Sequence, residues 1–436
     1  MSKKNKLIPE LRFPEFKNEG EWNYDKIDNL FHLQDGYAFS SNAFTHSKQN
    51  TKQVIRITDI NNQNKNGDKV FVSEETAKAL GVEKYKVKNG DLLLSLTGAA
   101  GFNFFIWKSD DAYINQRTMK LNSKKKENDS LKVILEPLVH SKINEIGTGQ
   151  NNNLSKDALK EIEFPFPNPN EQKKIAYCLS SLDEVIEEHS QRLDLLNKYK
   201  KGLIQNLFPQ EGEKIPKYRF REFKKEGAWL KETVGDVYDF KVTNSFAREY
   251  LNYENGTVKN IHYGDIHTKF NTLFDITRED VPFINTDVSI EKIRNECYCN
   301  VGDIVFADAS EDMNDVGKSI EIVNLNKEKL VSGLHTLLAR QKEKKLAIGF
   351  GGYLFKSDWV RKQIQREAQG AKVLGISATR ISNVQIAYPK NHKEQEAISL
   401  CLSSLDEVII SQTEKIKQLK QHKKGLIQGL FPKMID

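Results

Sequence analysis

The nine residues CLSSLDEVI occupy positions 178–186, and the same nine residues occur again at 401–409. Much of the chain between the two copies differs from the chain before the first copy. An identical segment at one large offset indicates an internal duplication. Because only two copies occur at so long a period, we predict a duplicated domain and not a solenoid, whose units are far shorter.

The duplication extends beyond these nine residues in both directions. PELRFPEFKNEGEW at 9–22 corresponds to PKYRFREFKKEGAW at 216–229, with nine of the fourteen positions identical. Downstream, KKGLIQNLFP at 200–209 corresponds to KKGLIQGLFP at 423–432. Each half therefore consists of an aromatic entry segment, a long variable region and a shared tail.

The shared tail has the pattern of a long coiled-coil helix. Its apolar residues are spaced alternately four and three apart over about five heptads in each copy, which keeps a narrow apolar seam on one side of a helix. The seam residues are Ile175, Leu179, Leu182, Ile186, Leu193, Leu196, Leu203 and Leu207, then Ile398, Leu402, Leu405, Ile409, Ile416, Leu419, Leu426 and Leu430. Polar residues fill the remaining seam positions and can fix the helix register; they are His189, Lys200, Gln412 and Lys423. A single amphipathic surface helix on each domain is the alternative interpretation.

Chain continuity predicts how the two helices run. A helix of about 36 residues is about 54 Å long, so the first helix carries the chain that far from the first variable region. The second half begins soon after the first helix ends, and the second helix then has to return. We therefore expect two antiparallel helices with one variable domain at each end. The predicted variable domains are 1–170 and 210–392, and the predicted long helices are 171–209 and 393–436.

The two variable regions share a weak skeleton. Residues 89–91 correspond to 301–303, and in both copies a Gly-Asp turn leads into an apolar run. Residues 57–60 similarly correspond to 263–266. Short strand-like runs are mixed with a few helix-like segments, which predicts an α+β fold for each half. The helix-like segments lie at about 130–146 and 355–369.

Composition and targeting signals exclude several classes of protein. Lys and Arg number 66 against 60 Asp and Glu, and this net charge of +6 permits a nucleic-acid partner without requiring one. Four cysteines do not make a disulfide framework, and the lone Cys297-x-Cys299 pair lacks a second pair that would complete a zinc site. The N-terminal segment has no apolar signal-peptide region, and the uncharged run 92–107 is too short and too polar to cross a bilayer. We expect a cytoplasmic protein.

The sequence contains no catalytic motif that we could identify. GKS at 317–319 resembles the end of a phosphate-binding loop, but Asp312 stands where that motif requires glycine. Zinc-protease, serine-hydrolase and N-P-P-aromatic methyltransferase motifs do not occur in the sequence. We therefore expect a chain without catalytic residues and without a bound metal.

The twin tails, the P-x-x-R-F-x-E-F entry segments and the two dissimilar variable regions resemble the specificity subunit of a type I restriction-modification system. The resemblance covers the whole chain. It implies that each variable region is a target recognition domain that reads one half of a bipartite site in double-stranded DNA. It also implies that the helices set the spacing and dock two methyltransferase subunits, and that motor-nuclease subunits join this core. S-adenosylmethionine, ATP and Mg²⁺ would then be bound by those partners, and this chain would need no cofactor.

The dimensions agree with that role. A rod of about 54 Å corresponds to about 16 base pairs at about 3.4 Å per pair, which bounds the separation of the two half-sites. An approximate two-fold axis between the halves would match the two-fold symmetry of duplex DNA.

Candidate DNA contacts follow from residue type, because Arg, Asn, Gln and Lys read base edges best and loops usually carry such residues. In the first domain the candidates are Tyr37, Gln116, Arg117, Gln150, Asn151 and Asn152. In the second domain they are Lys241, Asn244, His335, Lys372 and Arg380. A basic helix carrying Lys356, Arg361, Lys362 and Arg366 is expected to contact phosphates. The alternative for each of these residues is a solvated surface position.

Two other functions are compatible with the sequence. One is a stand-alone DNA nuclease or methyltransferase with unrecognised motifs, and the other is a coiled-coil scaffold that binds only proteins. For partner docking, we expect the first contact at the repeated acidic pair, which is Asp183-Glu184 in one copy and Asp406-Glu407 in the other.

Overall fold

The computed structural model describes residues 7–60, 69–97, 102–147 and 154–432. The chain divides into two compact units. Unit 1 comprises residues 1–190 and 415–436, and unit 2 comprises residues 191–414. Both division points lie inside long helices, so each unit combines one variable region with part of each shared tail.

Unit 1 alternates short strands with short helices and ends in a long helix. Its strands are β1 (Asn23–Lys26), β2 (Phe31–Asp35), β3 (Thr51–Ile55), β4 (Val70–Ser73), β5 (Lys86–Val87), β6 (Leu92–Ser95), β7 (Phe104–Ile106), β8 (Ala112–Ile114), β9 (Thr118–Ser123) and β10 (Glu163–Phe166). Its helices are α1 (Ile27–Leu30), α2 (Ile57–Ile60), α3 (Glu74–Ala79), α4 (Leu131–Gly147), α5 (Lys156–Lys160), the first part of α6 (Pro169–Leu207) and the last part of α12 (His392–Leu430).

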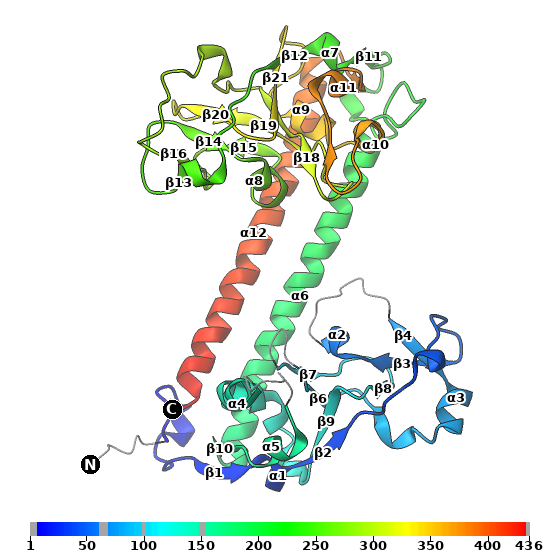
Figure 1. Cartoon of the computed structure of the whole chain (residues 1–436), viewed down its shortest axis with the longest axis vertical. Helices are drawn as coiled ribbons and strands as arrows, with labels where there is room; N and C mark the ends of the chain where they lie inside the picture. Colours follow the sequence, from blue (N-terminus) through cyan, green and yellow to red (C-terminus); the bar gives the residue numbers. More distant parts are fainter. Residues whose placement is uncertain (1–6, 61–68, 98–101, 148–153, 433–436) are drawn as a thin grey trace. The chain divides into compact units, whose positions relative to one another are not determined.

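Two sheets organise the described part of unit 1. The first has the strand order β2-β9-β6-β7 and is antiparallel throughout. The second has the order β4-β3-β8-β5, and its strands β3 and β8 run parallel. Helices α4 and α6 pack on the first sheet through a hydrophobic core that includes Leu92, Leu135 and Leu179 (Figure 1).

Unit 2 repeats most of the elements of unit 1 in the same order and adds several strands. Its strands are β11 (Leu230–Thr233), β12 (Tyr238–Lys241), β13 (Leu251–Asn252), β14 (Lys259–Ile261), β15 (Leu273–Asp275), β16 (Phe283–Ile284), β17 (Ile304–Ala307), β18 (Ala309–Ser310), β19 (Ser319–Asn324), β20 (Leu330–Ser332), β21 (Thr336–Gln341), β22 (Leu374–Gly375) and β23 (Gln385–Tyr388). Its helices are α7 (Val234–Val237), α8 (Tyr263–Thr268), α9 (Phe350–Leu354), α10 (Asp358–Glu367), α11 (Ala378–Ser382), the last part of α6 and the first part of α12.

The sheets of unit 2 repeat those of unit 1, with additions. The first sheet has the order β12-β21-β17-β19-β15, in which β15 runs parallel to β19. The second has the order β13-β16-β14-β20, in which β14 and β20 run parallel as β3 and β8 do. The pair β11-β23 corresponds to β1-β10. This correspondence confirms the predicted α+β fold and its internal duplication.

The predicted Gly-Asp turns are present and equivalent. Gly90 has φ of +89° and Gly302 has φ of +91°, a backbone conformation that side chains with a Cβ rarely adopt. The Gly90 N–H donates to the Trp107 carbonyl at 2.8 Å, and the Gly302 N–H donates to the Ile322 carbonyl at 2.8 Å. Each turn therefore places its following strand, β6 or β17, in the middle of the first sheet.

The two long helices pack on each other in the same way in each unit. In unit 1, Leu179 near the start of α6 shares a core with Leu430 at the end of α12. In unit 2, Leu207 at the end of α6 shares a core with Leu402 near the start of α12. The helices are thus antiparallel in each unit, as predicted. Every predicted seam residue is buried or half-buried.

Two of the polar seam residues form equivalent ion pairs. In unit 1, Lys423 Nζ lies 2.6 Å from Asp183 Oδ1. In unit 2, Lys200 forms an ion pair with Asp406. The two lysines occupy equivalent positions of the repeat, as do the two aspartates, so one interaction is built twice.

The entry segments fasten the beginning of each long helix. The Arg12 guanidinium makes two hydrogen bonds of 2.7 Å to the carboxylate of Glu171 in the first turn of α6. The Arg219 guanidinium makes the same two bonds of 2.7 Å to Glu394 in the first turn of α12. The side chains are almost fully buried, with exposures of 6% and 1% for the first pair and 8% and 0% for the second.

The tryptophans of the entry segments contact the opposite ends of the helices. Trp22 packs edge-to-face on Phe431, just after α12, with ring centroids 6.0 Å apart. Trp229 packs in the same way on Phe208, just after α6, also at 6.0 Å. Each entry segment therefore joins the beginning of one long helix to the end of the other. Within the described ranges, no helix is long and apolar enough to cross a membrane.

Candidate nucleic-acid interface

In unit 1, the predicted residues Tyr37, Gln116 and Arg117 come together at the ends of two strands. The chain leaves β2 through Gly36, and the Tyr37 N–H donates to the carbonyl of Ile114 at 3.0 Å. A Cβ on Gly36 would lie 2.0 Å from the Asn115 carbonyl oxygen, so only glycine permits this close approach. The turn after β8 is thereby held against the turn after β2.

Asn115 shapes the turn that presents the predicted polar residues. Its side-chain Oδ1 accepts from the Gln116 N–H at 2.8 Å, and its carbonyl accepts from the Thr118 N–H at 2.9 Å. The side chains of Gln116 and Arg117 are exposed on this turn. Tyr37 is half-buried and packs edge-to-face on Phe39 and at a tilt on Tyr85, with ring centroids 4.9 and 5.3 Å apart. The arrangement offers two exposed polar side chains beside an aromatic one.

Unit 2 brings Asn244 and His335 together in the equivalent place. The Asn244 N–H donates to the carbonyl of Ser332, at the end of β20, at 2.9 Å. This bond repeats the one between Tyr37 and Ile114, and it places Asn244 beside the turn that carries His335. The His335 backbone has φ of +55°, and its side chain is 50% exposed. The two units therefore have equivalent turns at this place, and each turn carries different side chains.

A cluster of aromatic and ionisable side chains surrounds His335. His335 Nδ1 lies 3.2 Å from Asp308 Oδ1, and its ring lies 5.3 Å from the Tyr263 ring. Tyr263 also stacks on His262 at 4.7 Å. Burial raises the pKa of Asp308, although the nearby His335 opposes this shift. Burial, followed by the charge of Arg248, lowers the pKa of His262 and favours the uncharged imidazole.

Three residues of this cluster were not singled out as a site from the sequence: Tyr263 at the start of α8, His262 just before it, and Asp308 just after β17. The correspondence of 263–266 with 57–60 was predicted, and both segments are short helices, α8 and α2. The contact of Tyr263 with His335 was missed, because Tyr263 is an isolated aromatic residue in the sequence. In the structure, Arg248 makes bonds of 2.9 and 2.8 Å to the buried Asp265 and fixes the start of α8.

The prediction of one basic helix face is wrong for two of its four residues. Lys356 precedes α10, and burial beside Lys200 lowers its pKa to about 7. Arg361 faces inward and donates to the carbonyls of Gly317 and Val316 at 2.9 and 2.8 Å, so it braces that loop. Lys362 and Arg366 are exposed on α10, and Arg366 lies 3.7 Å from Glu211.

The remaining candidates of unit 2 have separate positions. Lys372 is exposed in the loop before β22. Lys241, at the end of β12, lies 3.9 Å from Asp239 and is half-buried. Arg380 on α11 bonds to Glu367 at 3.1 Å and joins α11 to α10. In unit 1, three of the predicted residues lie outside the described residues; they are Gln150, Asn151 and Asn152.

Three of the four carboxylates of the repeated acidic pair form ion pairs within the chain. Asp183 and Asp406 form the ion pairs of the helix seam, and Asp406 also accepts from the Tyr353 hydroxyl at 2.7 Å. Glu407 pairs with Arg278. The expectation of exposure is therefore wrong for Asp183 and Asp406, which are half-buried, whereas Glu184 and Glu407 are exposed. Of these four carboxylates, Glu184 is the one that no described side chain pairs with.

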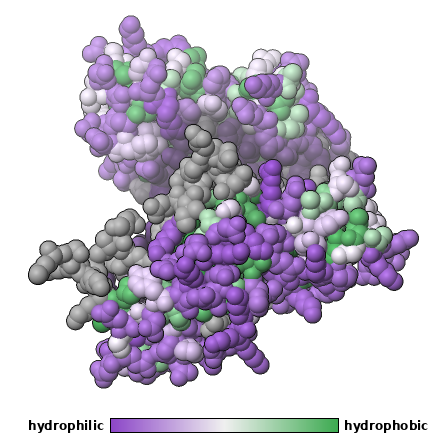
Figure 2. Space-filling view, turned by 60° about the horizontal axis from the view of Figure 1, so that its bottom comes forward, coloured by the Kyte–Doolittle hydropathy of each residue, from purple (hydrophilic) through white to green (hydrophobic). Residues whose placement is uncertain are grey.

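Polar side chains dominate the face of the molecule drawn in Figure 2. Figure 2 shows hydrophilic side chains over most of the visible face, with apolar side chains gathered in small patches. Within the described residues, no group of three or more His, Cys, Asp or Glu side chains is placed to hold a metal ion. Two equivalent α+β units, each with a polar turn at the same place in its fold, define a class of two-domain recognition subunits.

Comparison with known proteins identifies the family. The model of the type I restriction modification DNA specificity domain matches residues 19–198 and again residues 226–421. The chain therefore belongs to the family of type I restriction-modification specificity subunits. These subunits are non-catalytic, and the catalytic activity lies in partner subunits, so the enzyme and scaffold alternatives are not supported.

Individual relatives agree with this assignment. The chain is 26% identical to the type I restriction enzyme MjaVIII specificity subunit of Methanocaldococcus jannaschii over 362 residues, which cover 79% of each protein. It is 27% identical to the type I restriction enzyme EcoBI specificity subunit of Escherichia coli over 189 residues, which cover 42% of this chain and 38% of that protein.

Solved structures show the same fold at low sequence identity. The crystal structure of the S subunit of a type I restriction-modification system from M. genitalium matches with a TM-score of 0.60 and 15% identity, over 98% of this chain and 100% of that one. A chain from a study of complex assembly and conformational transition of the type I system matches with a TM-score of 0.51 and 14% identity, over 94% and 97%.

Proposed function

We propose that each unit reads one half of a bipartite site in double-stranded DNA, and that the polar turn at the ends of its strands makes the base contacts. The supporting observation is the equivalence of the two turns. One backbone arrangement carries Tyr37 with Gln116 and Arg117 in unit 1, and Asn244 with His335 in unit 2. A shared scaffold with different polar side chains is what a reader of two unlike half-sites requires.

Residue chemistry suggests separate roles within each interface. The guanidinium of Arg117 can donate two hydrogen bonds to one guanine, and the exposed amide of Gln116 can pair with adenine. Exposed cations away from the turn, such as Lys362 and Lys372, suit phosphate contacts, which position the protein without reading sequence. The same division of roles predicts that the two groups of residues respond differently to substitution.

The two long helices are proposed to set the spacing and to dock two methyltransferase subunits. Each helix has 39 residues, which corresponds to about 58 Å. Exposed apolar side chains recur at equivalent positions of the two helices. Tyr177 and Leu400 are 73% and 69% exposed, and Val185 and Val408 are 39% and 44% exposed. Such repeated apolar patches suit two copies of one partner.

The wider assembly follows from the same proposal. Motor-nuclease subunits would join through the methyltransferase core. S-adenosylmethionine, ATP and Mg²⁺ would be bound by those partners. The complex would act on chromosomal DNA in the cytoplasm.

A methylome of cells with and without the gene tests the function directly. We expect a methylated motif of two short half-sites separated by a fixed number of unspecified bases, present only when this chain and its partner subunits are expressed. If an intact system shows the same methylation with and without the chain, the proposal is wrong. Purified chain alone should neither methylate nor cut DNA when given S-adenosylmethionine, Mg²⁺ and ATP.

A further inference from the structure

The outer edge of strand β7 in unit 1 differs from its equivalent in unit 2. Strand β7 is the last strand of its sheet among the described residues. Its equivalent in unit 2, β19, is covered by a further strand, β15. An uncovered strand edge presents backbone N–H and C=O groups that can pair with another extended segment.

The strand registers show which residue of β7 is equivalent to which residue of β19. Leu92 pairs with Ile106 in unit 1, and Ile304 pairs with Glu321 in unit 2, in both cases just after the equivalent Gly-Asp turn. In unit 2, the outward Glu321 N–H donates to the Thr272 carbonyl at 2.9 Å. Ile106 is therefore the residue of unit 1 whose N–H occupies this position.

Strand β15 shows what kind of segment such an edge accepts. Leu273 inserts between the sheet and α9, where a Cβ on Gly352 would lie 3.0 Å from its Cδ2. Farther along the same segment, Arg278 pairs with Glu407 on α12. The position equivalent to Glu407 on α6 is Glu184, because each glutamate follows the aspartate of its CLSSLDEVI copy.

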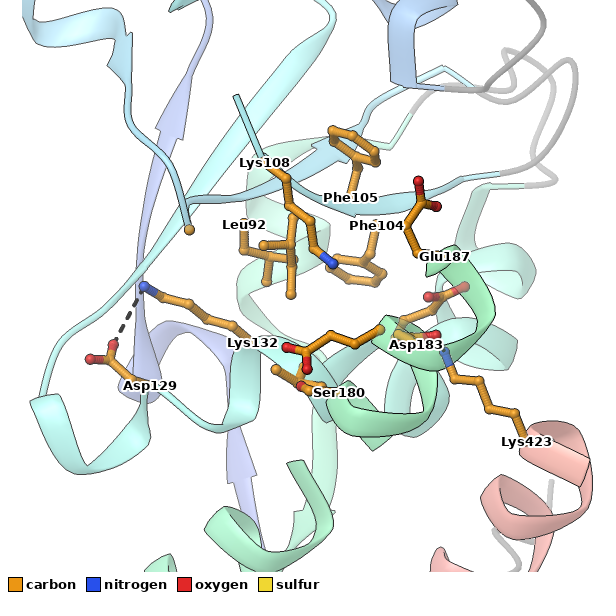
Figure 3. A pocket seen from close by; sticks show the side chains of 15 residues that line it. Leu92, Phe104, Phe105, Lys108, Asp129, Lys132, Ser180, Asp183, Glu187 and Lys423 are labelled. Carbon is orange, nitrogen blue, oxygen red and sulfur yellow. Dashed lines mark hydrogen bonds and ion pairs between the residues drawn. The ribbon is translucent and has the colours of Figure 1, made fainter. Parts of the chain in front are cut away.

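In unit 1, the corresponding space is an open pocket of about 670 Å³. Figure 3 shows Leu92 and Phe104 on the sheet side of the pocket, facing Asp183 and Glu187 of α6. Glu184 also lines it. The pocket thus combines an apolar wall, a strand edge that no described strand covers, and a carboxylate, in the positions that β15 and Arg278 use in unit 2.

The charges of the pocket favour an occupant that places a basic side chain against its carboxylates. Of its three lysines, Lys132 pairs with Asp129 at 3.4 Å and Lys423 pairs with Asp183 at 2.6 Å. Lys108 is the third lysine. Three glutamates line the pocket in addition to these aspartates; they are Glu136, Glu184 and Glu187.

The sequence of this chain favours an occupant from another protein. In unit 2, the segment between α8 and β16 contains Phe270, Leu273, Phe274 and Ile276, which fill both faces of β15. In unit 1, residues 61–68, NNQNKNGD, stand between α2 and β4 and contain no apolar side chain. An edge strand of this kind needs alternating apolar residues to fill its side-chain pockets.

We propose that the outer edge of β7 accepts an extended segment of a partner protein, which adds a strand to the sheet of unit 1. The segment places an apolar residue against Leu92 and Phe104, and an Arg or Lys farther along, at the spacing of Leu273 and Arg278, on Glu184. This inference does not depend on DNA reading, because the pocket shares no lining residue with the turn of Gln116 and Arg117.

A peptide with the sequence of residues 270–279, FNTLFDITRE, is the probe. We measure its binding to the full chain by fluorescence anisotropy, with a scrambled peptide as the reference. Glu184→Arg should weaken binding about tenfold or more, because it replaces a charge-assisted bond with repulsion. Asp194→Arg, an equal charge change on exposed helix α6 outside the pocket, should leave binding unchanged.

A backbone substitution tests strand addition itself. Trp107 N–H donates to the Asp91 carbonyl at 2.9 Å, toward β6, so the N–H of the preceding Ile106 points outward. Ile106→Pro removes that donor while the bonds to β6 remain, and it should weaken the probe about tenfold. Unchanged far-ultraviolet circular dichroism and DNA binding would show that the variant folds.

The outcomes separate the alternatives. Weaker binding in Glu184→Arg and Ile106→Pro, with Asp194→Arg unaffected, supports the proposal. Binding no tighter than the scrambled peptide, or equal binding by all variants, overturns it. The proposal also fails if the parent does not bind while a chain with residues 61–68 replaced by Gly and Ser does, because the chain itself would then occupy the edge.

Discussion

The ion pair between Arg219 and Glu394 should contribute strongly to the stability of unit 2. Glu394 is fully buried and Arg219 is 8% exposed, and the Trp229 indole also donates to Glu394 at 3.2 Å. Arg219→Ala would leave this carboxylate buried without its cation. Breaking a buried pair on one side typically costs about 3–5 kcal/mol.

This cost converts into a measurable shift in denaturant. For a unit of this size we take a urea dependence of about 3 kcal/mol per molar, so a loss of about 4 kcal/mol lowers the unfolding midpoint by about 1.3 M. Hydrogen exchange in increasing urea, followed by mass spectrometry of peptides from α10 and β21, reports on unit 2 separately from unit 1. Arg221→Ala, in the same entry segment and exposed, should shift the midpoint by less than about 0.2 M.

A double substitution distinguishes the pair from its surroundings. Arg219→Met with Glu394→Leu removes both charges and should recover most of the lost stability, because no uncompensated buried charge remains. If Arg219→Ala costs no more than Arg221→Ala, the buried pair does not stabilise the helix start and this reasoning is refuted. The equivalent Arg12→Ala should act on unit 1 peptides, since Arg12 makes the same two bonds to Glu171.

Three further predictions concern the exposed residues Arg117 and Lys362 and the lysine Lys356, whose pKa is lowered. Arg117→Ala should change the methylated motif or weaken binding to it, as read by methylome sequencing, whereas an unchanged motif and affinity would remove Arg117 from the interface. Lys362→Ala should weaken binding to all sequences alike and reduce the slope of log K against log salt by about 1, measured by a salt titration. Burial lowers the pKa of Lys356 to about 7 from 10.5, so the unfolded chain binds more protons than the folded chain between these values. The contribution of Lys356 to the stability of the parent should therefore rise from pH 7 toward pH 10. Lys356→Met should be more stable than the parent at pH 7 by a margin that shrinks with rising pH, as measured by urea unfolding.

The long helices could be predicted from sequence because their period is strict. The spacing of Leu179, Leu182 and Ile186, copied at Leu402, Leu405 and Ile409, requires no tertiary information. Their antiparallel packing followed from chain length alone. The buried pairs of Arg12 and Arg219 could not be derived in this way, because each glutamate partner lies at the far side of a whole variable region in the sequence.

The candidate interface could be predicted only in part. Residue type correctly indicated polar residues in turns, and the structure groups Tyr37 with Arg117 and Asn244 with His335. The basic helix was mispredicted because sequence does not reveal which side of a short helix faces inward. Arg361 follows the buried Val360 on α10 and turns toward the loop of Gly317.

The seam ion pairs have a consequence for how this gene can change. Asp183 is matched by Lys423 and Asp406 by Lys200, so each copy of the repeat carries the partner of the other copy. A substitution at one of these positions in one copy therefore has to remain compatible with its partner residue in the other copy. Gene conversion that restores identity between the copies restores both pairs at once, whereas independent drift of either copy breaks one. The variable regions make no such reciprocal demand and are free to diverge or be exchanged.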